Sequence, residues 1–542
     1  MNFKKLTAYI TAGALSVTAL FSFSACRNSD DKDPGYNYTF KTVLKGSPAT
    51  LDPQTAQNDC SVQIIPSLFQ GLYRYADGGA VVPAMAEEVT VSDDGLEWTF
   101  RIKENVKWYG KEDYSADCTA EDFVYGFRRL MNPALRAPRA KEYYFIKNAE
   151  EINTGKITDF SRLGVQAHGK YELKITLTEP RSDIMTMLAE PPAMPCNAGY
   201  YEYTEGQYGL VADCVGSNGD FYISRWHYDK WTKDGNFIEL KRNELNSENS
   251  FTAPRGVTYL INADSYDNFI KDETHTYCTS DAGKIQELTG KYQYDTYSVG
   301  VWGMIFNTGG IFGSKDLRTA LGGHLICEGD GKVYTSADMI VPDGVHFGEG
   351  DYRMLGGYPS VQEYSEAELS ERCDRALSSV EEGSLSGLRI ILPEGTGLKD
   401  LLGDTLQKWQ KYYGIYCMIS ELPYDSYLDA LNSGDFSIAM LRIGGGGKGA
   451  LSYIDRFSSG SPLNYSGISN PKFDDMINNA LSTKELQTAV KYCIEAEQFI
   501  LDNFWFVPLC FETEYVFSQK GVKGTEYDPF SGTFMYKNAV RK

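Results

Sequence analysis

Histidine is scarce in this chain, and positive charge is outnumbered by negative charge. Only five histidines occur among 542 residues, and no HExxH pattern is present. His275 and Cys278 have a spacing that suits a metal, but no second pair accompanies them, so the sequence predicts no metal site. Lys and Arg total 52 against 73 acidic residues, a formal net charge of -21. This balance argues against a nucleic-acid partner, because such binding needs clustered cations.

Catalytic and phosphate-binding motifs are missing as well. No GxSxG is present, and GSLSG at residues 383–387 has Leu385 where a nucleophile would stand. The glycine run LRIGGGGKG at residues 441–449 fails as a P-loop, because Arg442 replaces the first glycine and Gly449 follows Lys448. The sequence therefore indicates a binding protein with no cofactor, and not an enzyme.

Long apolar runs are absent after the N-terminus. Residues 6–23 form one uncharged apolar run behind the cationic MNFKK, and Ser24, Ala25 and Cys26 follow it. Small residues before a cysteine resemble the lipobox of bacterial lipoprotein signals. We expect cleavage after residue 25 and lipidation (palmitate among the acyl chains) of Cys26, although Phe23 departs from the usual Leu. Residues 26–37 then form a polar tether, and the rest lies outside the cell, in the periplasm if an outer membrane is present.

Ten cysteines follow Cys26, which is many for an exported chain. Cys417 and Cys510 lie in apolar strand-like runs, where a thiol behaves as a small buried hydrophobe. We favour free buried thiols, and one or two disulfides of unassigned pairing stay open.

The order of strand and helix patterns predicts an α/β fold. The second half alternates a strand at 388–393, a helix at 398–413, a strand at 415–422, a helix at 424–434 and a strand at 435–441. Short connections favour a parallel, doubly wound arrangement, in which ligands lie at the carboxyl ends of the strands. LRIGGGGKG stands at such an end, where its glycines form either a plain loop or a close approach for a ligand.

Several ordered runs resemble a known family. They begin with LDPQ and SLFQGLYRY, continue through TAEDFVYGFRRLMNP and VGSNGDFYISRW, and end with YSGISNPKFDDMINNAL and AEQFILDNFWFVPLCFETEYVF. Together they cover residues 38 to 535 and resemble the extracellular solute-binding proteins of family 5, which serve ABC importers. The resemblance implies a periplasmic-binding-protein-like class II fold, with two lobes, a hinge and an inserted small subdomain.

The expected units follow from this resemblance. The signal peptide covers residues 1–25 and the tether 26–37. Lobe I is discontinuous, the small subdomain interrupts it, and lobe II carries most of the later half of the chain. The expected ranges are 38–80, 190–270 and 505–542 for lobe I, 81–189 for the small subdomain, and 271–504 for lobe II.

The same resemblance implies a ligand site at LRIGGGGKG. Arg442 and Gly444 match the family pattern, whereas Gly445 replaces a tryptophan and Lys448 replaces the aspartate that pairs with a peptide's free amino group. An early acid of the first lobe falls on Gln57. We expect these residues to contact ligand, together with three aromatic residues that line the cleft: Tyr297, Trp302 and Tyr424.

Two readings of this pocket stay open. Either Arg442 and Lys448 attract a carboxylate or another anion, or Lys448 points into solvent and Asp455 or Asp59 takes over the ligand amine. The expected function is capture of peptides or a related solute by a monomeric, lipid-anchored component that delivers to an ABC permease. The alternative is a surface lipoprotein that uses the same scaffold for sensing or adhesion.

Overall fold

The computed structural model describes residues 38–542, apart from short stretches at 233–234, 247–253, 326–328, 330, 379–384, 386 and 445–448. The predicted signal peptide, the tether and the lipidation site Cys26 lie outside the described residues, as do Gly445 and Lys448. Within the described part, no helix has both the length and the apolar character needed to cross a membrane.

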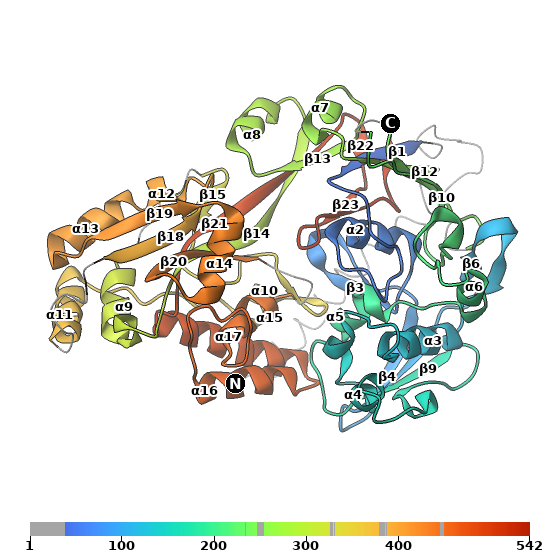
Figure 1. Cartoon of the computed structure of the whole chain (residues 1–542), viewed down its shortest axis with the longest axis horizontal. Coiled ribbons are helices and arrows are strands. Elements are labelled where there is room, and N and C mark those ends of the chain that lie inside the picture. The colour runs from blue at the N-terminus through green and yellow to red at the C-terminus, as the bar shows by residue number, and fades with distance from the viewer. Residues whose placement is uncertain are drawn as a thin grey trace, which may run out of the picture.

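A four-stranded sheet organises lobe I, on the right of Figure 1. β1 lies parallel to β12, whereas β12, β11 and β10 pair antiparallel. Their bounds are β1 Thr39–Leu44, β12 Gly256–Ile261, β11 Phe237–Arg242 and β10 Phe221–His227. The pairing joins segments more than 200 residues apart, as expected for a discontinuous lobe.

A second antiparallel sheet lies within the range expected for the small subdomain. Its order is β4 (Ala86–Val91), β5 (Glu97–Ile102), β9 (Glu172–Thr176) and β8 (Val165–Ala167). Helix α3 (Ala120–Met131) contacts β8 and β9 and starts at a capping box of Thr119 and Asp122, as its sequence predicts. One continuous hydrophobic core includes both Phe100 of this sheet and Phe40 of lobe I, so the two units pack as one body.

The largest sheet has seven strands and organises lobe II. β18 pairs in parallel with both β19 and β20, which confirms the predicted parallel arrangement. Helices α13 and α14 connect these strands, and α13 ends where Gly414 adopts a φ of 68°. The bounds are β18 Leu388–Pro393, α13 Gly403–Tyr413, β19 Cys417–Leu422, α14 Tyr424–Ser433 and β20 Ile438–Gly444.

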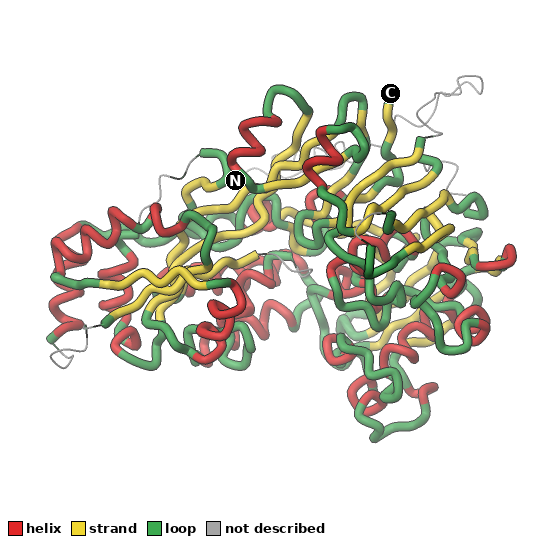
Figure 2. Tube along the Cα trace, turned by 45° about the horizontal axis from the view of Figure 1, so that its top comes forward, coloured by secondary structure: helices red, strands yellow, loops and turns green. Residues whose placement is uncertain are grey.

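Two long strands, β14 (Gln293–Phe306) and β21 (Phe506–Ser518), run between the lobes and pair antiparallel, and we call them the crossing strands. Figure 2 shows them as continuous yellow tubes that leave lobe II toward lobe I. β14 is exposed over its first residues and buried over its last eight. β21 lies in the range expected for lobe I, yet it also pairs with β15 (Tyr334–Ser336) and β13 (Thr276–Thr279) of the seven-stranded sheet. The unit boundaries therefore stay a prediction.

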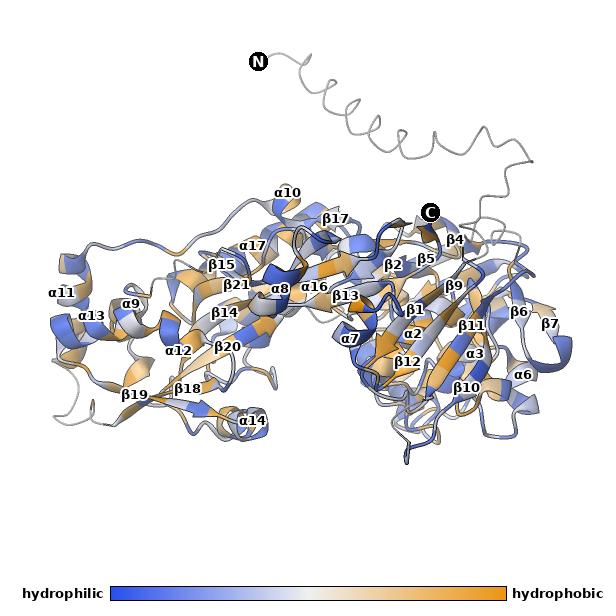
Figure 3. Cartoon of the chain, turned by 90° about the horizontal axis from the view of Figure 1, so that it is seen from above, coloured by the Kyte–Doolittle hydropathy of each residue, from blue (hydrophilic) through white to orange (hydrophobic). Residues whose placement is uncertain are grey.

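A second connection links the small subdomain to lobe II. Ser182 donates from its backbone N to Leu481 O (3.0 Å) and from Oγ to Ala480 O (2.7 Å). Lys484 Nζ donates to the carbonyl oxygens of Ser92 (3.2 Å) and Asp93 (2.6 Å). These contacts follow helix α16 (Pro471–Leu481), and Figure 3 shows the lobes meeting near α16 and β13.

Two predicted elements have different bounds in the structure. The strand predicted at 435–441 is β20, which starts at Ile438 and continues through Arg442 to Gly444, because β14 supplies pairing partners as far as Gly300. The helix predicted at 398–413 is divided into α12 (Leu398–Leu401) and α13. Nearer the N-terminus, helix α2 covers Asp59–Leu68 and strand β2 covers Tyr73–Tyr75. The nine cysteines among the described residues are free.

Candidate functional site

Arg442 lies near the carboxyl end of β20, where the sequence predicts a ligand contact. Its Nε lies 2.5 Å from Glu512 Oε2, and Nη2 donates to Val299 O at 3.2 Å. The side chains of Arg442 and Glu512 are 39% and 17% exposed. The guanidinium is therefore paired with an acid of the protein itself and still reaches solvent.

Two glycines allow this side chain to fold back over the sheet. Gly300 of β14 is the register partner of both Gly444 and Glu512, so it lies between the strands that carry the ion pair. A Cβ on Gly300 would lie 3.2 Å from Arg442 Cζ, and one on Gly444 would lie 2.7 Å from Nη1. Gly444 thus provides the close approach that the glycine run suggested, toward the protein's own guanidinium.

Tyr297 and Trp302 both lie on β14, but their surroundings differ. Trp302 is the register partner of Arg442, is 6% exposed, and has an indole Nε1 with no hydrogen-bond partner in the part of the chain that is described. The Tyr297 hydroxyl donates to Asp77 Oδ1 of lobe I at 2.8 Å, and its ring lies 5.3 Å from that of Tyr527. Burial, and then the hydrogen bond to Asp77, raise the pKa of Tyr297 well above its usual range.

Two other predicted residues lie away from Arg442 in sequence and environment. Tyr424 begins α14 and is 64% exposed, with its ring 6.3 Å from that of Tyr427. Gln57 is exposed just before α2 in lobe I. No contact joins either residue to Arg442 among the described residues, so their role as ligand contacts stays a prediction.

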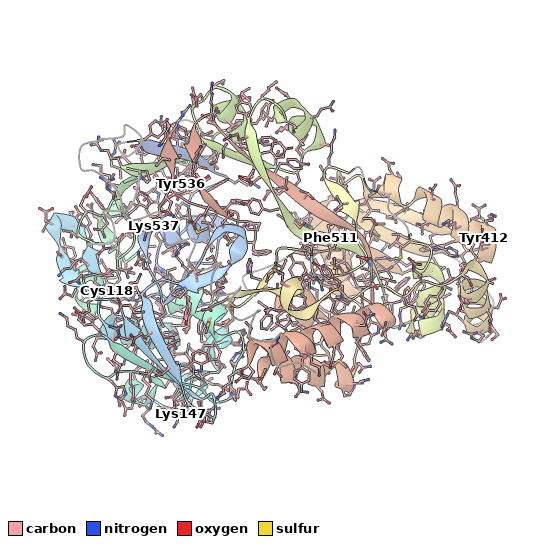
Figure 4. The ribbon with its side chains drawn as sticks, turned by 180° about the vertical axis from the view of Figure 1, so that it is seen from behind. Cys118, Lys147, Tyr412, Phe511, Tyr536 and Lys537 are labelled. Carbon is pink, nitrogen blue, oxygen red and sulfur yellow. The ribbon has the colours of Figure 1, made fainter. Side chains whose placement is uncertain are left out.

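A cavity of about 630 Å³ lies along α2 in lobe I. Its lining comes from residues 45–103, 189–220 and 528–537, and includes Asp59 and Cys60 immediately after Gln57 and Asn58. Lys537, labelled in Figure 4, lines its wall and pairs with Asp220 at 3.2 Å. A cavity of this size suits a small organic ligand.

The cavity carries both signs of charge beside apolar surface. Four basic and four acidic residues line it, together with rings such as Phe69, Tyr73 and Phe530. The charged members are Lys45, Arg74, Lys103, Lys537, Asp59, Glu190, Asp220 and Asp528. Burial raises the pKa of Asp528 to about 6, although Ser531 and the backbone N of Phe530 donate to its carboxylate.

The cavity adjoins the crossing strands through Tyr527, next to its lining residue Asp528. Tyr527 donates from its hydroxyl to Glu514 Oε2 (2.6 Å) and from its backbone N to Asp77 Oδ1 (2.9 Å). Burial raises the pKa of Glu514, and the neighbouring Glu512 raises it further. We call Asp77, Tyr297, Arg442, Glu512, Glu514 and Tyr527 the charged cluster.

Sequence reasoning missed Glu512 and Glu514. Both lie in FETEYVF, two positions apart in an otherwise apolar strand, so they share one face of the sheet. That alternation was the available signal. The acids named as alternatives lie elsewhere: Asp59 lines the lobe I cavity, and Asp455 begins a short helical turn, Asp455–Phe457.

His275, which the sequence pairs with Cys278, forms hydrogen bonds within the protein. His275 accepts from the backbone N of Lys41 at Nδ1 (2.8 Å), and its Nε2 bonds the Tyr38 hydroxyl (2.5 Å). Both ring nitrogens are thus engaged by protein groups. Among the described residues, no group of three or more His, Cys, Asp or Glu could hold a metal ion.

Two lobes joined by crossing strands, with a cavity beside the junction, define a two-lobed α/β fold of the periplasmic-binding-protein-like class II type. Residues 80–323 match the model of bacterial extracellular solute-binding proteins, family 5. This match supports the resemblance that the sequence predicts to a family of binding proteins.

Curated relatives match over nearly the whole chain. The dipeptide-binding protein DppE of Bacillus subtilis is 22% identical, over 90% of this chain and 89% of the relative. The oligopeptide-binding protein OppA of the same organism is 23% identical, over 96% of each.

Solved structures agree on the fold. The unliganded open form of the murein tripeptide-binding protein MppA gives a TM-score of 0.75 at 21% identity, covering 93% of this chain and 97% of that one. Listeria monocytogenes OppA bound to peptide gives 0.65 at 20% identity, covering 93% and 99%.

Proposed function

We propose that this protein is the lipid-anchored, extracellular solute-binding component of an ABC importer, and that it captures peptides between its two lobes for delivery to a membrane permease. The observation that carries the proposal is the lobe I cavity of about 630 Å³, which adjoins a charged cluster on the crossing strands. The family match and the peptide-binding relatives support it.

The cavity lining suits a peptide better than a simple ion or a lipid. A peptide has polar main-chain groups, charged ends and side chains of varied character. Balanced charges and aromatic rings in one cavity match that mixture, because each class of ligand group finds a complementary surface. A purely apolar ligand would leave the buried charges without compensation.

Capture follows from closure of lobe II over a ligand held on lobe I. A ligand drives this movement only if it binds the closed state more tightly than the open one. We assign ligand contacts in the closed state to the residues that the sequence indicates: Gln57, Tyr297, Trp302, Tyr424, Arg442, Gly444, Gly445 and Lys448.

Thermal unfolding with defined peptide pools tests the proposal. A ligand at ~100 times its dissociation constant adds about 2.7 kcal/mol to the stability of the bound protein, which raises the melting temperature measurably. Val62 lines the cavity from α2, so V62W should fill it and remove the response. V89W places the same ring at a 36% exposed site on β4, outside the cavity, and should respond like wild type.

Two outcomes contradict the proposal. Either no peptide pool stabilises the wild-type protein, or V62W responds as strongly as V89W although both variants are folded. The second outcome places peptide binding away from the lobe I cavity.

The lipid anchor has a separate test. Growth with an alkyne-tagged fatty acid should label the wild-type protein, and C26A should lose the label and leave the membrane fraction. C60A, at a cavity-lining cysteine, is the control and should keep the label. Labelling that survives C26A would overturn the anchoring.

A further inference from the structure

Arg442 is paired with an acid of the protein itself. Its Nε contacts Glu512 at 2.5 Å, and the glycines at 300 and 444 leave room for the guanidinium to lie across β14 toward that acid. A ligand anion that approached Arg442 would therefore compete with Glu512 and would face Glu514 as well. Like charges in a closing site oppose binding, so Arg442 is a poor receptor for an anion here.

The local balance of charge is negative. Asp77, Glu512 and Glu514 contribute three carboxylates, and Arg442 and Lys45 contribute two cations that act on Glu514. Burial lowers the pKa of Arg456, and the neighbouring Asp455 acts in the opposite direction, so this cation already has an acid beside it. A ligand cation would therefore offset the excess of negative charge among the described residues, whereas a ligand anion would increase it.

The position of Trp302 gives a second, independent indication of a ligand. The indole Nε1 is buried, and within the described ranges it has no hydrogen-bond partner. Because Trp302 and Arg442 are opposite each other in the antiparallel pair, their side chains lie on the same face and close together. This unpaired indole donor beside Arg442 fits a ligand carbonyl.

We propose that Glu512, supported by Glu514, binds the primary ammonium of the ligand, and that Arg442 occupies this place only while the site is empty. The ligand ammonium replaces the guanidinium on Glu512, so the partly buried carboxylate keeps a cationic partner as the lobes close. The exchange breaks one ion pair and forms another. The inference rests on the proposed peptide-binding function and deepens it, because it makes a free amine the specificity determinant.

The test compares trialanine with N-acetyl-trialanine by isothermal titration calorimetry on the full mature chain. Wild type should bind the free amine roughly 10- to 100-fold more tightly than the acetylated form, the effect of one charge-assisted hydrogen bond. E512Q should lose most of this preference. R442Q removes the competitor and should bind the free amine about two- to fivefold more tightly than wild type, since a partly exposed ion pair contributes little.

A matched control is E371Q, which removes an acid from another Arg–Glu pair, Arg375 with Glu371, on helix α11 (Glu366–Leu377). It should behave as wild type. Equal binding of both peptides to wild type, an unchanged preference in E512Q, or weaker free-amine binding in R442Q would each overturn the inference while peptide binding stands. If neither peptide, nor any pool, binds the wild-type protein, the proposed function and this inference both fail.

Discussion

Two Arg–Glu pairs in the second half of the chain differ in how fully they are satisfied. Arg353 and Glu497 are 1% and 0% exposed, and Glu497 also accepts from the backbone N of Ile340 (2.9 Å) and Val341 (3.0 Å). Arg442 and Glu512 are 39% and 17% exposed. The first pair is a fixed part of the core, whereas the second keeps solvent access and can exchange partners. The same two residue types thus form a buried structural pair in one place and a partly exposed pair in the other, where we propose a role in recognition.

The interior pair should show the largest effect on stability. E497A leaves Arg353 as a buried cation without its partner and leaves two backbone N–H groups unpaired. We expect a loss of about 3–5 kcal/mol in the free energy of unfolding. The urea unfolding midpoint, followed by tryptophan fluorescence, measures this loss. A midpoint within roughly 0.2 M of wild type would contradict this role.

His275 extends the comparison to a buried group with neutral partners. Burial, and then the charge of Arg541, lower the pKa of His275 to about 4. The unfolded chain protonates this ring near its ordinary pKa of about 6.5, so it binds more protons than the folded state between pH 6.5 and 4. Stability should fall as the pH drops through this window, by up to about 3 kcal/mol.

Urea midpoints measured from pH 7 to pH 4 check this slope. In H275Q, the unfolding free energy should fall less steeply as the pH drops from 6.5 to 4, although the variant is less stable than wild type at pH 7. H168Q changes an exposed histidine and should keep the wild-type slope. A slope that H275Q leaves unchanged would assign the acid sensitivity to other groups.

The pair at the crossing strands should matter little for folding. E512Q and R442Q remove a partly exposed contact, so each should change the free energy of unfolding by less than about 1 kcal/mol. Melting temperatures of the ligand-free variants measure this. If either variant lost as much unfolding free energy as E497A, the Arg442–Glu512 pair would be as important for folding as the Arg353–Glu497 pair.

The smallest effect is expected for a fully solvated pair on the helix that also carries Glu497. Lys491 and Glu495 lie one turn apart on α17 (Leu486–Asp502), 3.9 Å from each other, with side chains 75% and 47% exposed. E495A should cost about 0.3–0.5 kcal/mol or less, measured beside E497A under the same conditions. If E495A and E497A lost similar amounts of unfolding free energy, burial would not determine how much an ion pair contributes to stability.

Local signals predicted the elements that depend on local chemistry. The capping box at Thr119 placed α3, and Gly414 placed the end of α13. The parallel strands β18, β19 and β20 followed from alternating apolar patterns and short connections. These features are decided within a few residues, so one sequence contains them.

Features that depend on distant pairing were not predictable in the same way. β20 reaches Gly444 because Gly300 lies opposite, about 140 positions away in sequence, and no local pattern near Arg442 contains that partner. The contact between Arg442 and Glu512 has the same origin. At the candidate site, the sequence correctly placed Arg442 near a strand end, but its acidic partner Glu512 is found only in the folded chain.

The hydrogen bonds of Ser182 and Lys484 limit how one lobe can swivel against the other. The crossing strands are one point of attachment, and these contacts are another at a distance from it. We expect lobe II to rotate about a line that passes through the crossing strands and the contacts of Ser182 and Lys484, because this rotation leaves both connections intact. Rotation about other axes would break the contacts at Ser182 and Lys484, so we expect the lobes to close along a single arc.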